Sequence, residues 1–235
     1  MSETITIAPE KKQADTGNSN KMLFAMVGIG LMCALLIVLT YEGTKPIIAK
    51  NKAAALEQAI FKVLPGTVTT AGYYWNGNAF TPLKGTEAEG QRVYAGFSES
   101  GTLTGLALPA VGLGYAGEIR VLYGYDPAQE AIVGFYVLES KETPGLGDKI
   151  EKDPAFKANF EALSVAVGTD GNSLKNKIAY AKSGEKQNAW EVDGITGATI
   201  SSKAVTEALS TSTAEWVPKL YEAKEAFKPQ TQSHE

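Results

Sequence analysis

One uncharged apolar segment near the N-terminus constrains this chain more than any other feature. From Met22 to Tyr41 there are twenty residues without a charged side chain. As a helix rising about 1.5 Å per residue, the segment would span about 30 Å, the thickness of the hydrocarbon core of a bilayer. A buried core helix or a cleaved signal peptide is the alternative, but signal-peptide cores are usually shorter, and no convincing cleavage pattern precedes Lys45. We expect a transmembrane helix over residues 22–41.

The segments around this helix suggest how the chain is organised. Residues 1–21 are polar and are expected to form a disordered cytoplasmic tail. Residues 42–66 are expected to form a juxtamembrane helix and linker that ends at Pro65-Gly66. A folded domain is expected over residues 67–227, followed by a flexible tail over residues 228–235. Three lysines precede the apolar segment and three follow it closely, so the positive-inside rule does not decide its orientation.

The scarcity of two residue types excludes several kinds of site. The chain has one cysteine, Cys33, and one histidine, His234. Iron–sulfur, zinc and covalent haem sites, and catalytic triads, need sets of these residues that one chain of this sequence does not contain. Redox chemistry would therefore require an organic cofactor. The net charge of -4 and the lack of a basic stripe argue against a nucleic acid partner.

The pattern of the folded domain predicts an α+β class, with antiparallel strands and packed helices. A turn sequence at residues 126–129 predicts a β-hairpin between two strand candidates, and a glycine-rich loop is expected at residues 112–117. Pro218 is expected to kink or break the last helix. The strand candidates are residues 92–97, 103–108, 118–125, 131–138, 177–182 and 189–195, and the helix candidates are residues 152–163 and 202–216.

The most informative motif is Asp-Gly-Ile-Thr-Gly-Ala-Thr-Ile-Ser-Ser at residues 193–202. Gly197 permits backbone geometry that is closed to other residues, and Ala198 lets a bulky group approach. Thr199 opens a predicted helix, where free N–H groups and the helix dipole attract an anion. The alternative is an ordinary strand–turn–helix in which Thr199 or Ser201 caps the helix. These residues alone leave both interpretations open.

A second loop gives the motif its context. Residues 139–150 read Glu-Ser-Lys-Glu-Thr-Pro-Gly-Leu-Gly-Asp-Lys-Ile, a tight loop directly after a predicted strand. The order and spacing of this loop, the glycine-rich loop and the Thr-Gly-Ala-Thr motif resemble the FMN-binding domain of two related membrane complexes. The closer resemblance is to the G subunit of the Rnf ion-translocating electron-transport complex. The other is to the C subunit of the sodium-translocating NADH:quinone reductase. The resemblance covers nearly the whole chain after residue 20. Many family members have serine where this chain has Thr196, a difference that keeps the hydroxyl group.

The resemblance implies a covalent cofactor and a set of binding residues. Thr199 would carry FMN through a phosphoester, installed by an ApbE-type flavin transferase. Glu142, Thr143, Gly145 and Leu146 would lie against the flavin. Tyr115 is a candidate aromatic neighbour, and Asp193 would belong to the signal that the transferase reads. The remaining candidate cofactor-binding residues are Thr196, Gly197, Ala198, Ser201, Ser202 and Lys203.

The resemblance also implies a location and a role. The domain would lie on the periplasmic or extracytoplasmic side of the cell membrane. The protein would relay electrons between ferredoxin and NAD, and the whole complex, with its membrane and iron–sulfur subunits, would couple this flow to Na⁺ or H⁺ translocation. It would be an electron carrier rather than a stand-alone catalyst. The quinone-reductase protein is the nearest alternative, and a membrane-anchored binding or scaffold domain without covalent flavin is a more distant one.

Overall fold

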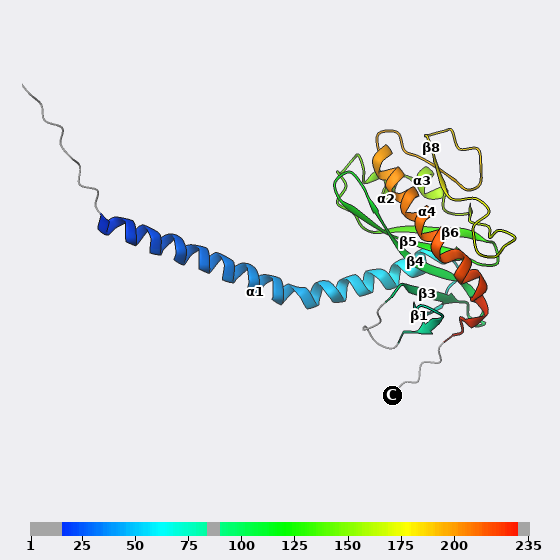
Figure 1. The fold of residues 1–235 in the computed structure, drawn as a ribbon, viewed down its shortest axis with the longest axis horizontal. Helices are drawn as coiled ribbons and strands as arrows, with labels where there is room; N and C mark the ends of the chain where they lie inside the picture. The colour runs from blue at the N-terminus through cyan, green and yellow to red at the C-terminus, as the bar shows by residue number, and fades with distance from the viewer. Residues whose placement is uncertain (1–15, 84–89, 230–235) are drawn as a thin grey trace, which may run out of the picture. The chain divides into compact units, whose positions relative to one another are not determined.

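The structure is a computed structural model that describes residues 16–83 and 90–229 (Figure 1). The helices are α1 Thr16–Val63, α2 Lys149–Lys152, α3 Pro154–Ala158, α4 Thr199–Glu222 and the 3-10 helix η1 Lys224–Ala226. The strands are β1 Thr69–Trp75, β2 Phe80–Pro82, β3 Arg92–Phe97, β4 Leu103–Leu113, β5 Glu118–Asp126, β6 Ala131–Glu139, β7 Leu163–Ser164, β8 Ala179–Ala181 and β9 Glu191–Asp193.

The predicted apolar helix is part of a longer one. Among the described residues, α1 is the one helix long and apolar enough to cross a membrane, judged by length and composition. It begins at Thr16, within the expected tail over residues 1–21, the rest of which lies outside the described residues. It continues through Pro46 to Val63, so residues 42–63 are not a separate helix. Extending an existing helix costs far less than nucleating a new one, which favours the single helix. The chain divides after Lys52 into two compact units, and the second contains the folded domain.

The folded domain is built on an antiparallel sheet. In the described part of the chain, the seven strands β1 to β7 lie in the order β2-β1-β3-β4-β5-β6-β7. The predicted hairpin is confirmed: β5 pairs with β6 across a turn in which Asp126 Oδ1 accepts a hydrogen bond from the Ala128 N–H at 2.8 Å. Strands β8 and β9 form a separate parallel pair. Strands β1 and β2 were not predicted, because Gly72 interrupts the first and the second is very short.

Several predicted boundaries were wrong. Of the helix expected over residues 152–163, only Pro154–Ala158 forms a helix of its own, α3, while Lys152 ends α2 and Leu163 begins β7. Asp153 separates α2 from α3, because it accepts hydrogen bonds from the N–H groups of Ala155 and Phe156 and so begins a new helix at Pro154. Helix α4 passes through Pro218, which lies near its end, and continues to Glu222. Strand β4 extends to Leu113 and so takes the first two residues of the expected glycine-rich loop.

Helix α4 and the end of α1 cover the sheet. Figure 1 shows α4 lying across the sheet, where its apolar side chains, among them Val205 and Leu209, join the main core. Ile60 and Val63 of α1 form a second core with Leu122 of β5. Since the main-core strand residues and Leu122 point to opposite faces of the sheet, each face has its own apolar cover.

Two glycines let the α1 backbone approach the sheet closely. Gly124 of β5 and Gly134 of β6 are cross-strand partners. A Cβ atom built at either position would overlap the carbonyl oxygen of Val63. A backbone atom cannot move aside as a flexible side chain can. We infer that this glycine pair fixes where α1 ends on the sheet.

We predict that Gly124→Ala lowers the free energy of unfolding of the domain by about 1–3 kcal/mol, the usual cost of overpacking. Gly72→Ala is the matched control in a strand, because its new Cβ meets the side chain of Leu83 at 3.2 Å, which can shift. Urea unfolding followed by tryptophan fluorescence measures both, since Trp75, Trp190 and Trp216 all lie in the domain. An equal loss in the two variants would contradict the close approach.

Candidate functional site

Three segments that are distant in the sequence enclose one cavity of about 330 Å³. They are the turn between β4 and β5, the loop after β6, and the start of α4. The sequence resemblance named residues from all three segments. The lining residues are Tyr115, Glu142, Thr143, Leu146, Gly147, Gly197, Ala198, Thr199, Ile200 and Ser201.

The buried carboxylate of Glu142 joins these segments. Its side chain is 7 % exposed. Oε1 accepts a hydrogen bond from the Ala116 N–H at 2.8 Å, and Oε2 accepts one from the Ser201 hydroxyl. Glu142 was predicted to contact a cofactor; it does line the cavity, but both its oxygens are bonded to the protein. The Glu142 side chain therefore holds the β4–β5 turn and the start of α4 together.

Two glycines make room for this carboxylate. A Cβ at Gly114 would lie 2.6 Å from Glu142 Oε1, and a Cβ at Gly147 would overlap Oε2. Real Cβ atoms essentially never come this close to another atom. The second glycine of each Gly-Leu-Gly sequence, Gly114 and Gly147, is therefore required by the packing of the Glu142 carboxylate.

At the start of α4, the N-cap side chain accepts no hydrogen bond from the first backbone N–H groups. Gly197 adopts a left-handed conformation, with φ of 84°, and Ala198 is the N-cap. Alanine has no polar side chain, whereas helices usually begin with a residue that bonds the first N–H groups. Neither Thr199 nor Ser201 caps the helix: Thr199 is its first residue, and the Ser201 hydroxyl bonds Glu142. The exposed Thr199 hydroxyl thus stands at a helix end that attracts an anion.

The loop after β6 is fixed by its own contacts. Gly145 has a positive φ of 81°, and its N–H donates to Asp148 Oδ1 at 2.6 Å. Lys152 Nζ donates to Asp148 Oδ2 at 2.5 Å, and this hydrogen bond holds the pKa of the Asp148 carboxyl below its usual value. Gly145 therefore shapes the loop without lining the cavity.

Large apolar side chains border the cavity yet remain open to solvent. Tyr115 is 76 % exposed, Leu146 is 54 % exposed and Ile200 is 52 % exposed. Apolar side chains gathered at the mouth of a cavity mark a ligand site more often than a bare surface. The cavity thus offers apolar walls beside an anion-attracting helix end, a combination that suits a flat ring carrying a phosphate.

Besides Gly145, four predicted site residues do not line the cavity. Thr196 and Asp193 line a different hollow of about 290 Å³, and the Asp193 carboxylate accepts a hydrogen bond from the Gly184 N–H at 2.8 Å. Lys203 Nζ lies over the ring of Tyr180, 5.3 Å from its centroid. Ser202 is buried, and its hydroxyl donates to the Ala198 carbonyl at 2.9 Å. A position in or next to the motif in the sequence was therefore not enough to bring these side chains into the cavity.

The structure adds three residues that the sequence analysis did not single out. Gly147 and Ile200 line the cavity. Lys149 places its Nζ 3.9 Å from the Cβ position of Gly197, so it is a cation beside the Thr-Gly-Ala-Thr turn. Lys149 belongs to the quoted Gly-Asp-Lys-Ile sequence, but its position next to Gly197 depends on the folded loop. Within the described residues, no group of three or more His, Cys, Asp or Glu could hold a metal ion.

Comparisons with known proteins agree with this geometry. Residues 114–213 match the family model of the FMN-binding domain. The G subunit of the ion-translocating oxidoreductase complex of Methanosarcina acetivorans is 32 % identical over 201 residues, which cover 83 % of this chain and 93 % of the relative. The G subunit of the Na⁺-translocating ferredoxin:NAD⁺ oxidoreductase complex of Acetobacterium woodii is 37 % identical over 99 residues, 42 % of each chain.

A solved structure supports the fold. The C subunit of the Na⁺-translocating NADH-quinone reductase from Parabacteroides distasonis superposes with a TM-score of 0.55 at 21 % identity, covering 77 % of this chain and 94 % of that one. The α+β class predicted from the sequence is confirmed by the antiparallel sheet and by this likeness.

We predict that Glu142→Ala lowers the free energy of unfolding by about 2–3 kcal/mol, because the buried Ser201 hydroxyl and the Ala116 N–H lose a charged acceptor. Glu142→Gln should lose clearly less, since its amide can still accept from Ala116 and donate to the Ser201 hydroxyl. Urea unfolding of both variants tests this. A Glu142→Ala variant as stable as the unmodified chain would show that the carboxylate does not hold the three segments together.

Proposed function

Because this chain belongs to the family of G subunits of ion-translocating oxidoreductase complexes, we propose that it carries electrons through an FMN attached by a phosphoester to Thr199. The observation that supports the attachment residue most directly is the position of Thr199. Its exposed hydroxyl lies at an α4 N-terminus whose N-cap, Ala198, has no polar side chain, and it lines the apolar cavity.

The residues at the cavity fit such a group. A phosphate on Thr199 would face the first N–H groups of α4, which carry the positive end of the helix dipole. Lys149, close to Gly197, would add a positive charge beside the turn. Leu146, Ile200 and Tyr115 would offer apolar contact to the ring system. When bound, FMN supplies the electron-transfer chemistry that the side chains of this chain lack.

Glu142 would have a second effect on the bound group. A buried carboxylate is poorly screened, so its negative charge acts strongly on its surroundings. A negative charge near a flavin disfavours the addition of electrons, which lowers the reduction potential. The hydrogen bonds from Ala116 and Ser201 offset part of that charge. The same side chain would thus both hold the cavity together and tune the cofactor.

The role within the complex follows from the family. The protein would relay electrons between ferredoxin and NAD, as the name of the Acetobacterium woodii relative describes for its own complex. Helix α1 would anchor it in the membrane with the domain on the extracytoplasmic side. The apolar segment from Met22 to Tyr41 has no ionisable side chain other than Cys33 and Tyr41, so ion translocation would belong to partner subunits.

Attachment of the cofactor would need a second protein. A threonine hydroxyl is a weak nucleophile without a neighbouring base. The one carboxylate that lines the cavity, Glu142, already accepts hydrogen bonds from Ala116 and Ser201. An ApbE-type flavin transferase would therefore form the phosphoester in trans, with Asp193 and Thr196 in the sequence that it reads.

We predict that Thr199→Ala, coexpressed with a flavin transferase, loses the covalent flavin while keeping its fold. Flavin fluorescence of the protein band on a denaturing gel measures attachment, and circular dichroism measures folding. Thr211→Ala is the matched control, because Thr211 is an exposed threonine on the same helix. A Thr199→Ala protein that still carries covalent flavin would contradict the assignment.

A further inference from the structure

The second half of strand β4 has a neighbouring strand on only one of its two sides. Strand β3 follows β4 as far as the pair Tyr94 and Ala107. Strand β5 continues to pair with β4 up to Leu113, opposite Glu118. Beyond Ala107, no strand of the described residues pairs with the β3 side of β4. Among the described residues, the segment from Ala110 to Leu113 therefore has an open edge on that side.

The backbone groups that face this edge can be identified. The Pro109 carbonyl accepts a hydrogen bond from Gln91 Nε2 at 3.4 Å, and Gln91 lies just before β3. Backbone groups of alternate residues in a strand point to the same side. The N–H and C=O of Val111 therefore face the open edge, whereas those of Ala110 and Gly112 face β5. Proline is tolerated at such a position because it has no N–H to leave unpaired.

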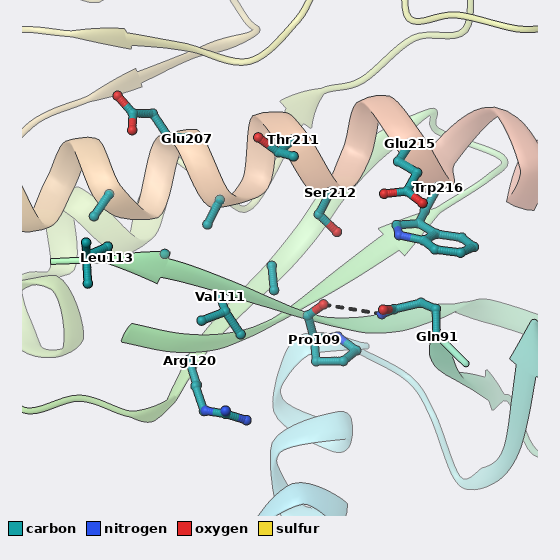
Figure 2. A pocket seen from close by; sticks show the side chains of 14 residues that line it. Gln91, Pro109, Val111, Leu113, Arg120, Glu207, Thr211, Ser212, Glu215 and Trp216 are labelled. Carbon is teal, nitrogen blue, oxygen red and sulfur yellow. Dashed lines mark hydrogen bonds between the residues drawn. The ribbon is translucent and has the colours of Figure 1, made fainter. Parts of the chain in front are cut away.

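A groove of about 570 Å³ runs along this edge beneath α4. Figure 2 shows Pro109, Val111 and Leu113 along the strand and Glu207, Thr211 and Glu215 along the helix above it. Helix and strand are close: a Cβ at Gly112 would overlap the carbonyl oxygen of Ala204. The open edge is therefore one wall of a groove, and the other wall is the side of α4 that carries Glu207, Thr211 and Glu215.

The helix wall carries two glutamates at a spacing that suits a strand, and the one cation among the residues that line the groove, Arg120 of β5, lies 3.4 Å from Glu118. Glu207 and Glu215 are eight residues apart, about 12 Å along a helix. Residues four apart in an extended chain point to the same face and are about 13 Å apart. Lys219 lies 3.8 Å from Glu215, but this exposed pair is weak and can open. Two basic side chains four residues apart on an added strand would meet the two glutamates.

We propose that the open edge of β4 pairs with an extended segment of a partner protein of the complex that carries two basic side chains four residues apart. Backbone hydrogen bonds to Val111 would supply affinity, and Glu207 and Glu215 would select the sequence. Exposed strand edges are usually protected, and a partner strand is one means of protection. This inference stands on the groove, separate from the cofactor cavity, and does not depend on the proposed electron-transfer role.

Hydrogen exchange at single amides tests the pairing. The probe is the full-length chain in detergent, alone and within the assembled complex. Alone, the Val111 amide should exchange much faster than the amides of Ala110 and Gly112, which point to β5. Within the complex, exchange at Val111 should slow roughly tenfold or more. Slow exchange at Val111 in the isolated chain would show that the chain covers its own edge and would overturn the proposal. Unchanged fast exchange in the complex would also overturn it.

A charge reversal tests the chemistry of the segment. Glu207→Lys should reduce the protection of Val111 in the complex, or reduce the retention of the protein there. Glu222→Lys is the matched control, because Glu222 is an exposed glutamate of α4 that does not line the groove. If the Val111 amide is equally protected in complexes that contain either variant, the segment that pairs with β4 is not basic and the proposal fails.

Discussion

The candidate site depends on one buried carboxylate. Glu142 accepts hydrogen bonds from the Ala116 N–H and the Ser201 hydroxyl, so it joins the β4–β5 turn, the loop after β6 and the start of α4. Nothing larger than glycine fits at positions 114 and 147 without displacing that carboxylate. Ser201 is the third residue of α4, and the helix begins with Ala198 as its N-cap, whose side chain makes no hydrogen bond, so its first N–H groups are available to an anion. The contacts of Glu142 thus hold the turn and the start of α4, with its exposed Thr199, at the same cavity.

The sheet gives this contact a rigid frame. Helix α4 packs on one face and the end of α1 on the other, where Gly124 and Gly134 let the α1 backbone approach. Strand β4 lies next to both proposed sites. Its end leads into the turn that binds Glu142, while its unpaired edge faces the groove under α4. Cofactor binding and contact with a partner protein can therefore use neighbouring surfaces of the same strand and helix without sharing a cavity.

Short-range sequence patterns predicted much of the fold, but they did not predict contacts between segments that are distant in the sequence. The turn at residues 126–129 identified the β5–β6 hairpin, and the strand expected over residues 92–97 has the bounds of β3, because both signals lie within a few residues. The end of α3 at Ala158 was missed, since Phe156, Phe160 and Leu163 keep the apolar spacing of a helix beyond it. At the site, Thr199, Glu142 and Leu146, which the sequence analysis expected at the cofactor, all line one cavity. Lys203 was expected to act there because it is close in sequence, whereas Lys149 lies beside Gly197 only through the folded loop.

The central claim is that Thr199 carries the cofactor of this electron-transfer protein. Intact mass after denaturation, measured on the unmodified sequence coexpressed with an active flavin transferase and followed by peptide mapping, tests it most directly. We expect a gain equal to the mass of FMN less one water, located on the peptide that contains Thr199. An unchanged mass, with the transferase shown to modify a control substrate, or a flavin located on another residue, would contradict the account.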